Sequence, residues 1–294
     1  MVVFQALTWE SRDTDEEHLI SIFGKTEEGK SVCLTTAFTP YFFIKLPEKI
    51  DAGKIRRIYN ILDETCKDSV VGYSVTKSKD VWGFQNNQEF AFMKINFKHL
   101  QARRFVDSFL RKPLDRTPEL FSIFGVRNVK VYEANLDPVL RLMHRTGIQS
   151  TGWMDTGDKC IRSHFARVDT DLFCNDWTTL KPAARDDIAP FVVASVDIEC
   201  NSSTGKFPDA DVTGDACFQI AISLCKFGSD EPYDKTCLCY KKTDPNLEGS
   251  TILSYDTERE MLEAFQKYLH KNDIDIITGW NIFGFDMEYI YKRA

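Results

Sequence analysis

FVVASVDIEC, residues 191–200, is a run of mostly apolar, β-prone residues that carries two acids near its end, Asp197 and Glu199. Side chains alternate between the two faces of a strand, so both acids are expected on one face and Val196 and Ile198 on the other. Desolvating a carboxylate is costly unless a cation or hydrogen-bond donors compensate for it. The two acids therefore either reach the surface at the strand end or lie against a positive charge.

The residues after Pro190 predict a mixed sheet flanked by helices. Their apolar patterns indicate three adjacent strands, a helix, a returning strand and a second helix. The expected strands cover 191–200, 217–228, 235–243 and 274–280, and the expected helices cover 257–272 and 287–294. Thr257, with Glu260 three residues later, forms a capping box at the start of the first helix. This arrangement is typical of an α/β layer architecture.

The residues before this sheet predict a separate α+β domain. Strands are expected at 2–11, 18–26 and 31–47, and helices at 51–66, 99–112 and 134–147. The segment TLKPAARDDIAP, residues 179–190, has the composition of a linker. A chain of 294 residues is long enough for two domains. We therefore expect an N-terminal domain at 1–185 and a second domain at 186–294.

The composition indicates a globular protein that is not secreted and makes no use of a membrane. The chain is 43% hydrophobic and 28% charged, and no apolar run approaches the ~20 residues that span a bilayer. The N-terminus has neither a basic flank nor a small-residue cleavage site. Nine cysteines without a C-x-x-C pair indicate reduced thiols in the cytoplasm or nucleus. Cys237 and Cys239, expected on one face of a strand, leave a zinc site as the alternative.

The net charge of −7 argues against a protein that coats nucleic acid over its whole surface. One stretch, residues 98–145, nevertheless holds ten basic and five acidic residues, a local charge of +5. A solvated helix face explains most such stretches. A surface that follows a phosphate backbone is the alternative.

The segment TGWNIFGFD, residues 278–286, follows the last expected strand and leads into the last helix. Asp286 stands where a helix N-cap would be, so capping alone could explain it. Asn281 could likewise be a turn residue, and Phe285 could pack into the core. The local sequence leaves these alternatives open.

D-I-E followed by N-x-x-x-F-D resembles the first and second exonuclease motifs of family B DNA polymerases. D-x-E alone is common and recurs at 15–17 and 286–288, so the resemblance depends on the ordered motifs. Residues 196–222, with Gly205-x-Phe207-Pro208, are similar to the version in delta-type polymerases and large DNA viruses. Residues 27–47 and 131–153 resemble the N-terminal domain of the same polymerases. The resemblance implies a ribonuclease-H-like exonuclease domain of the D-E-D-D group.

The resemblance also implies a two-metal nuclease with named ligands. Asp197 would bridge two Mg²⁺ or Mn²⁺ ions, Glu199 would bind the ion that activates water, and Asp286 would help to hold the other. Two such ions, roughly 4 Å apart, stabilise the attacking and leaving oxygens of a displacement at phosphorus. Asn281 would position the 3′-terminal nucleotide, and Phe285 would pack beside its base. DNA with a frayed single-stranded 3′ end is the expected partner, in the nucleus or the cytoplasm of a cell, or of an infected host if the protein is viral.

The family's third motif, a Y-x-x-x-D on a later helix, supplies a fourth carboxylate, and Tyr289 and Tyr291 in the helix expected after Asp286 do not fit it because neither has an Asp four residues on. We therefore expect an N-terminal fragment of a replicative DNA-directed DNA polymerase, cut within its 3′→5′ exonuclease domain and inactive by itself. A sliding clamp and accessory subunits would bind other regions of that polymerase. A stand-alone D-E-D-D exonuclease and a non-catalytic nucleic-acid-binding module are the alternatives.

Overall fold

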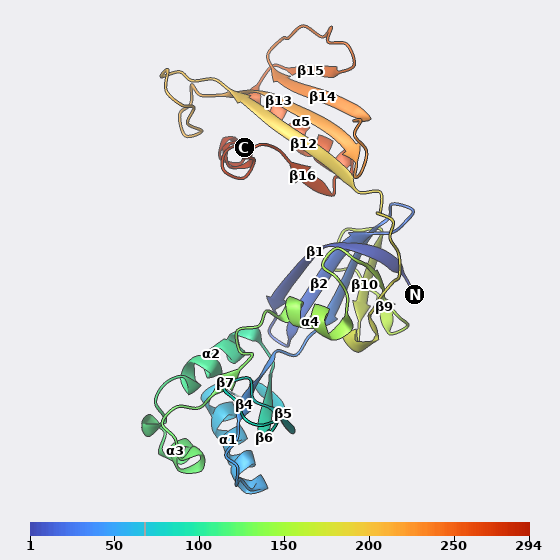
Figure 1. Cartoon of the computed structure of the whole chain (residues 1–294). Coiled ribbons are helices and arrows are strands. Elements are labelled where there is room, and N and C mark those ends of the chain that lie inside the picture. The colour runs from blue at the N-terminus through green and yellow to red at the C-terminus, as the bar shows by residue number, and fades with distance from the viewer. Residues whose placement is uncertain (68) are drawn as a thin grey trace. The chain divides into compact units, whose positions relative to one another are not determined.

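A computed structural model gives the fold of residues 1–67 and 69–294 (Figure 1). The chain forms two compact units. The N-terminal unit comprises Met1–Thr26 and Lys30–Arg185, and the C-terminal unit comprises Glu27–Gly29 and Asp186–Ala294. Both units combine helices with β-sheet, which confirms the α/β fold class expected from the sequence.

One part of the N-terminal unit is a seven-stranded sheet of order β11-β8-β1-β2-β3-β10-β9. Its strands are β1 (Val3–Asp13), β2 (His18–Lys25), β3 (Ser31–Ala37), β8 (Trp153–Asp155), β9 (Cys160–Arg162), β10 (Thr170–Cys174) and β11 (Lys181–Pro182). Helix α4 (Pro138–Thr146) contributes Leu142 to the core of this sheet, beside Phe4, Ile20 and Leu34. A short 3-10 helix, η2 (Trp177–Thr179), follows β10. The antiparallel β1–β2–β3 order agrees with the strands expected at 2–11, 18–26 and the first part of 31–47.

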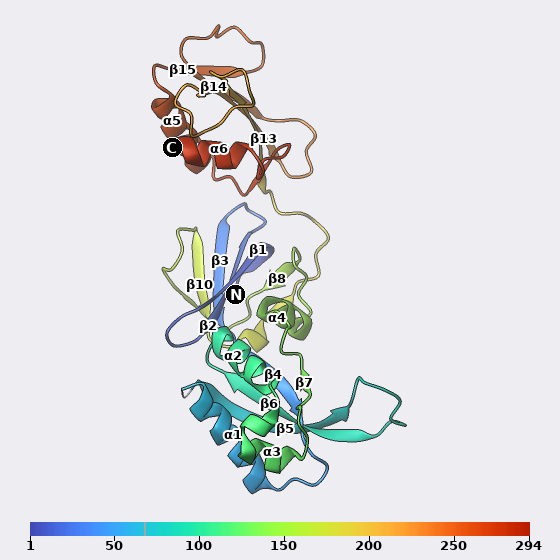
Figure 2. The same ribbon diagram turned by 90° about the vertical axis from the view of Figure 1, so that its left-hand side faces the viewer.

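The other part of the N-terminal unit is a four-stranded sheet of order β5-β6-β4-β7, with helices packed on it (Figure 2). Its strands are β4 (Tyr41–Lys45), β5 (Val70–Lys79), β6 (Glu89–Phe97) and β7 (Val131–Tyr132). Its helices are α1 (Ala52–Thr65), α2 (Leu100–Leu110), α3 (Pro118–Phe124) and the 3-10 turn η1 (Leu114–Arg116). Ile58, Val106 and Leu120 of the three α-helices pack against Ile44 and Ile95 of the sheet. The expected helices at 51–66 and 99–112 are therefore confirmed, whereas β5 and β6 were not predicted.

The C-terminal unit is a five-stranded mixed sheet of order β15-β14-β13-β12-β16. Its elements are β12 (Val192–Cys200), β13 (Cys217–Lys226), β14 (Asp234–Tyr240), β15 (Thr251–Tyr255), α5 (Glu258–Lys271), β16 (Ile276–Thr278) and α6 (Asp286–Arg293). The β12–β13–β14 pairs are antiparallel, and β16 runs parallel to β12. The expectation of only three strands before the first helix was incomplete, because β15 adds a fourth, parallel to β14.

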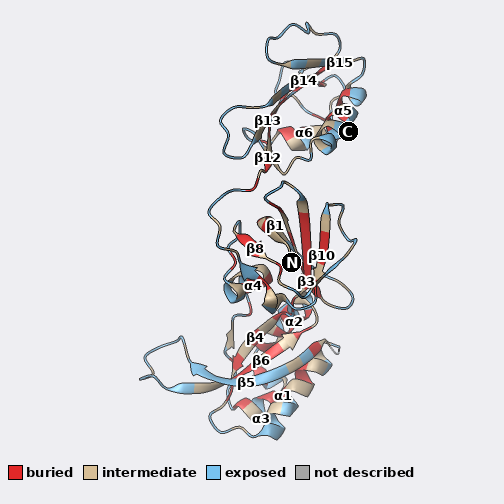
Figure 3. Cartoon of the chain, turned by 90° about the vertical axis from the view of Figure 1, so that its right-hand side faces the viewer, coloured by how far each residue is buried: buried red, intermediate tan, exposed pale blue. Residues whose placement is uncertain are grey.

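The core of the C-terminal unit lies between this sheet and its two helices. Val196, Ile198 and Ile222 of the sheet pack against Met261 and Phe265 of α5. Buried and exposed residues alternate along much of β12 and β13, and Figure 3 colours the chain by burial. The capping box at the start of α5 is present, since the Thr257 hydroxyl accepts from the Glu260 amide and the Glu260 carboxylate accepts from the Thr257 amide. The sequence therefore predicted this helix correctly, together with its buried face.

Within residues 1–67 and 69–294, the helices are all too short or too polar to cross a membrane.

Candidate active site

Asp197 and Glu199 project from the same face of β12, as the alternation of a strand predicts. Both residues are exposed, whereas Val196 and Ile198 between and beside them are buried. The cost of desolvation that the sequence raised is therefore avoided in this unit, because the two carboxylates face solvent. They can receive a cation without first being taken out of the protein interior.

Asp286 lies beside these two acids although it is separated from them by almost ninety residues. It is the first residue of α6 and is 3% exposed, and its Oδ1 accepts a hydrogen bond from the Ile198 amide at 3.2 Å. Phe285, not Asp286, occupies the N-cap position, so the interpretation of Asp286 as the cap is wrong. The carboxylate of Asp286 is instead held against the backbone between Asp197 and Glu199.

The pKa of Asp286 reports this environment. Burial raises the pKa of Asp286 above its usual value, and the negative charge of Asp197 raises it further, while hydrogen bonds from its own amide and that of Ile198 lower it in part. A carboxylate that is buried beside a second carboxylate favours a bound proton or cation. The same electrostatics would make this position attractive to a divalent metal ion.

One glycine lets the segment 278–286 pass close to β12, and a second lets the segment fold closely on itself. A Cβ atom at Gly279 would lie 2.4 Å from the carbonyl oxygen of Val196, so the chain passes β12 too closely for any other residue. A Cβ atom at Gly284 would lie 2.3 Å from Oδ1 of Asn281. Asn281 is exposed and adopts the left-handed backbone conformation with φ +51°. Its backbone carbonyl oxygen accepts hydrogen bonds from the Gly284 and Phe285 amides. It is thus a turn residue whose side chain lies over Gly284.

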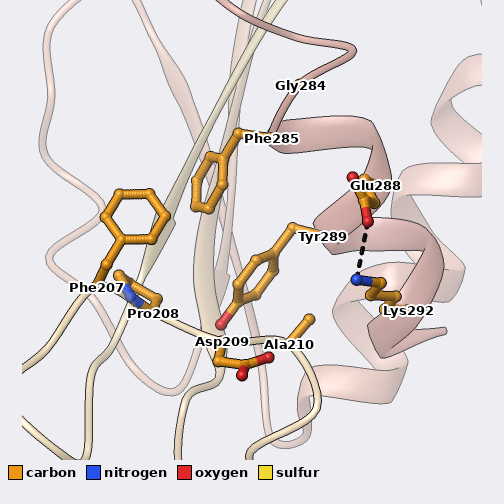
Figure 4. Close-up of a pocket in the computed structure, with 9 residues that line it drawn as sticks. All are labelled: Phe207, Pro208, Asp209, Ala210, Gly284, Phe285, Glu288, Tyr289 and Lys292. Carbon is orange, nitrogen blue, oxygen red and sulfur yellow. Dashed lines mark ion pairs between the residues drawn. The ribbon is translucent and has the colours of Figure 1, made fainter.

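Phe285 forms an aromatic cluster with Phe207 and Tyr289, for which no functional role was predicted. Its ring centroid lies 5.1 Å from that of Phe207 and 5.2 Å from that of Tyr289. The cluster lines an open cavity of about 320 Å³ in which Glu288 and Lys292 form an ion pair of 2.8 Å along α6 (Figure 4). The Gly205-x-Phe207-Pro208 element was the signal that could have identified Phe207, because it places an aromatic residue in a polar loop.

The three acids suit a hard divalent cation but do not enclose one. Carboxylate oxygens are the ligands that Mg²⁺ and Mn²⁺ prefer. Asp197 and Glu199 provide them from β12, and Asp286 provides them from α6. Over the whole described part of the chain, no three His, Cys, Asp or Glu side chains converge into a complete metal site. The donor types therefore fit the expected ions, with further ligands required from substrate, water or another carboxylate.

The alternative zinc site is not supported. The sulfur atoms of Cys237 and Cys239 lie 3.6 Å apart, and both residues point to one face of β14 as expected. The absence of a three-ligand group extends to this pair in residues 1–67 and 69–294. A structural Zn²⁺ site needs four ligands.

The basic stretch 98–145 is largely used within the N-terminal unit. Arg103 and Arg141 are buried and donate to the carbonyl oxygens of Leu136 and Tyr41. Arg141 also pairs with Glu133, and three other bases form ion pairs: Lys98 with Glu16, Arg111 with Asp107, and Arg127 with Asp115. The positive charge available to a phosphate backbone is therefore smaller than the count of bases in the sequence suggests.

Comparison with known proteins places these features in a family. The family model described as "DNA polymerase family B, exonuclease domain" matches residues 129–294, more than half of the chain. The chain belongs to this family. The resemblance of its motifs to those of family B polymerases is thereby confirmed, and the α/β fold is the one expected for the N-terminal and exonuclease regions of these enzymes.

Similar proteins cover nearly the whole chain. The DNA polymerase of Acanthamoeba polyphaga mimivirus is 30% identical over 99% of this chain and 18% of its own length. The DNA polymerase of Paramecium bursaria Chlorella virus NY2A is 29% identical over 100% of this chain and 31% of its own length. The DNA polymerase delta catalytic subunit of Schizosaccharomyces pombe is 26% identical, with 100% and 27% coverage. The chain thus spans less than a third of each of these relatives.

A solved structure shares the fold. The family B DNA polymerase from the hyperthermophilic archaeon Pyrobaculum calidifontis aligns with a TM-score of 0.68 at 20% sequence identity, over 100% of this chain and 32% of that one. At this level of identity the similarity concerns the fold. It agrees with the assignment of this family B chain to a mixed α/β architecture.

Proposed function

We propose that this family B chain carries part of the two-metal 3′→5′ proofreading exonuclease of a replicative DNA-directed DNA polymerase. The observation that supports this most directly is the position of Asp286. The hydrogen bond from the Ile198 amide holds its carboxylate beside the strand that carries Asp197 and Glu199. Three carboxylates from two separate motifs thus share one region of the C-terminal unit.

In this proposal the three acids hold two Mg²⁺ or Mn²⁺ ions. When bound, such ions supply positive charge to the attacking and leaving oxygens of a phosphodiester. Asp197 and Glu199 contribute carboxylates that are already exposed, so binding requires no opening of the fold. Asp286 contributes a buried carboxylate of raised pKa, which a cation would stabilise in its charged form.

The aromatic cluster and the turn beside it would bind the substrate. Phe285 and Phe207 present ring surfaces at the cavity shown in Figure 4, and an unpaired base can stack on such a surface. Asn281 presents an exposed amide on the segment that joins β16 to α6. We infer that the substrate is DNA with an unpaired 3′ terminus.

Two other functions differ from this one in what they predict. A stand-alone exonuclease would have the same site without polymerase activity, whereas the curated relatives that cover the chain carry DNA polymerase names and are more than three times as long. A non-catalytic nucleic-acid-binding module would not need a cation at the three acids. Metal binding therefore separates the module from the nuclease.

The decisive experiment measures Mn²⁺ binding by calorimetry and the release of 3′ nucleotides from a single-stranded oligonucleotide. Asp197→Ala is expected to weaken Mn²⁺ binding at least tenfold and to abolish any nucleotide release. Asp15→Ala, in the D-x-E pattern of the polar turn at 15–17, is the matched control and should change neither quantity. Equal Mn²⁺ binding by the wild-type chain and Asp197→Ala would reject the metal-site assignment.

A further inference from the structure

The loop that joins β12 to β13, residues 201–216, holds an aromatic side chain in solvent. Phe207 in this loop is 77% exposed, and its ring nevertheless contacts the ring of Phe285. Gly205, just before it, has φ +73°, a conformation that other residues rarely adopt. An exposed phenylalanine on a long loop would ordinarily move between many positions. Something in the loop must fix this one.

A buried carboxylate connects three points of the loop. Asp215 is 1% exposed, and its Oδ1 accepts hydrogen bonds from the Ser203 amide and from the Ser203 hydroxyl, each at 2.6 Å. Its Oδ2 accepts from the Asp209 amide at 3.0 Å. Ser203 and Asp209 lie on either side of Phe207, so the carboxylate closes the backbone around this residue. Hydrogen bonds to an ionised acceptor are stronger than neutral ones.

Helix α6 holds the same loop from the other side. The Tyr289 hydroxyl donates to the carbonyl oxygen of Asp215 at 2.6 Å. The guanidinium group of Arg293 donates to the carbonyl oxygens of Ala210 and Val212, each at 3.2 Å, and also pairs with Glu258 of α5. Helix α6 begins at Asp286, directly after Phe285. These bonds therefore attach the loop to the helix that also carries Phe285 at its start.

We propose that Asp215 is a positioning residue that holds Phe207 opposite Phe285, so that the two rings receive the base of the 3′-terminal nucleotide. This inference rests on the proposed exonuclease function and adds to it how the substrate end is held. Asp215 is a buried residue of the loop itself, and in this proposal it affects DNA binding only through the position of Phe207. The hydrogen bonds of its carboxylate also lower its pKa, the Ser203 hydroxyl contributing most.

The test compares Asp215→Ala with Asp211→Ala, an exposed acid in the same loop, so that both variants lose one negative charge. Each variant and the wild-type chain is mixed, in EDTA, with a single-stranded oligonucleotide that carries 2-aminopurine at its 3′ end. Stacking on an aromatic ring quenches the fluorescence of 2-aminopurine. Asp215→Ala should bind the 3′-labelled end about tenfold more weakly, the scale of one lost stacked base, and Asp211→Ala should match the wild type.

Three controls distinguish a positioning role from a structural one. An oligonucleotide with 2-aminopurine at an internal position should bind the wild type and Asp215→Ala with similar quenching. Trypsin should cut after Lys206, beside Phe207, at least severalfold faster in Asp215→Ala. Ser203→Ala, which removes only the hydroxyl bond, should show smaller changes in the same direction if Asp215→Ala fails to fold.

The possible outcomes are separable. Quenching by the wild type and by a folded Asp215→Ala to the same extent overturns this inference and leaves the proposed function intact. Unchanged cleavage at Lys206 overturns it as well, because the loop would then not depend on Asp215. A wild-type chain that does not quench the 3′-labelled oligonucleotide at all overturns the proposed function itself.

Discussion

At the scale of single residues, the exposed acids of β12 should be dispensable for folding. Asp197 and Glu199 face solvent, and their removal creates neither a cavity nor an unpaired buried group. We expect Asp197→Ala and Glu199→Ala each to change the free energy of unfolding by less than about 0.5 kcal/mol, while any 3′ nucleotide release falls by orders of magnitude. Urea titration and an oligonucleotide assay measure the two effects. A loss of several kcal/mol would assign the acids to the fold instead.

Gly279 should be much less tolerant. A methyl group there would stand 2.4 Å from the Val196 carbonyl oxygen and 3.2 Å from a methyl carbon of Ile282. The contact with backbone cannot be relieved by a side-chain rotation, so β12 and β16 must separate. We expect Gly279→Ala to destabilise the C-terminal unit by about 2 kcal/mol or more. Gly53→Ala, near the start of α1, is the control: its Cβ would lie 3.1 Å from the side-chain oxygen of Asp51, not from backbone, and alanine favours helix, so we expect a change of less than about 1 kcal/mol.

The site residues differ in how far the sequence could predict them. The common face of Asp197 and Glu199 follows from strand alternation alone. The position of Asp286 cannot be derived in this way, because its hydrogen bond from the Ile198 amide joins residues 88 positions apart and depends on the close approach of the chain to β12 at Gly279. Phe207 was visible as part of a motif, but its contact with Phe285 is made through a loop whose shape depends on the buried carboxylate of Asp215.

At the scale of elements, helix α2 owes its start to a residue far away in the sequence. His99, at the N-cap position, makes no capping bond, and the carboxylate of Asp13 at the end of β1 accepts from the Leu100 amide at 2.9 Å and the Gln101 amide at 3.0 Å. Asp13 also accepts from Nδ1 of the buried His18 at 2.7 Å. One side chain therefore joins a strand, a hairpin and a helix.

Asp13→Ala should consequently cost more than an ordinary helix cap. Loss of a cap costs about 1 kcal/mol, and an unpaired buried histidine adds to it, so we expect about 2–3 kcal/mol in total. Asp13→Asn, which keeps one acceptor, should lose about half as much. Chemical denaturation of the chain measures the difference. Asp15→Asn, in the following turn, is the control; an equal loss in that variant would argue against the capping role.

The β5–β6 hairpin should be sensitive to acid. Burial would raise the pKa of Asp80, but hydrogen bonds from Lys45, the Trp82 amide and Tyr132 outweigh it and lower the pKa to about 2. Because the folded pKa lies below the ordinary value of 3.8, the stabilisation is complete above about pH 4 and is lost as the pH falls through 2. The exchange rate of the Trp82 amide, divided by its intrinsic rate at the same pH, should therefore rise in this range.

The matching variant removes this dependence. Asp80→Asn should exchange the Trp82 amide faster at neutral pH, and the ratio of this rate to the intrinsic rate should change little between pH 4 and 2. Glu89→Gln, an exposed acid on the same hairpin, should keep the wild-type profile. If the relative exchange rate of the Trp82 amide still rose in acid in Asp80→Asn, another titrating group would be responsible for the rise.

Local signals decided which elements could be predicted. Helix α4 has a local signal at each end, Asp137 at the N-cap and Gly147 at the C-cap, and α5 has one at its start, the capping box of Thr257 and Glu260. These ends could therefore be predicted from the local sequence. Strand β5 escaped notice because nearly all of its residues are exposed and no buried face imposes alternation. Strand β15 is only five residues long and pairs on one side. Each is defined by its neighbours in the sheet.

At the scale of the whole molecule, the two units have separate hydrophobic cores. The C-terminal core is drawn from residues 192–290, and the two N-terminal cores are drawn from residues 2–180. Within the described residues the units share no core residue. Because each unit has its own core, we expect a mutation in one core to weaken that unit alone.

The cysteines make this independence measurable. All nine are free, and four are buried: Cys33 and Cys174 in the N-terminal unit, and Cys217 and Cys239 in the C-terminal unit. Burial also raises the pKa of Cys33, which slows its reaction further. A buried thiol reacts with a labelling reagent when its unit opens, so the labelling rate reports the stability of that unit.

We expect Gly279→Ala to accelerate the labelling of Cys217 and Cys239 about thirtyfold or more, the factor that corresponds to about 2 kcal/mol, and to leave Cys33 and Cys174 unchanged. Asp13→Ala should accelerate the labelling of Cys33 and Cys174 and leave that of Cys217 and Cys239 unchanged. Peptide mapping by mass spectrometry after timed labelling gives the rate at each cysteine, and labelling in urea should modify all nine. Parallel acceleration of all four buried thiols by either variant would show that the units unfold as one, and that the energetic coupling between them exceeds what their separate cores suggest.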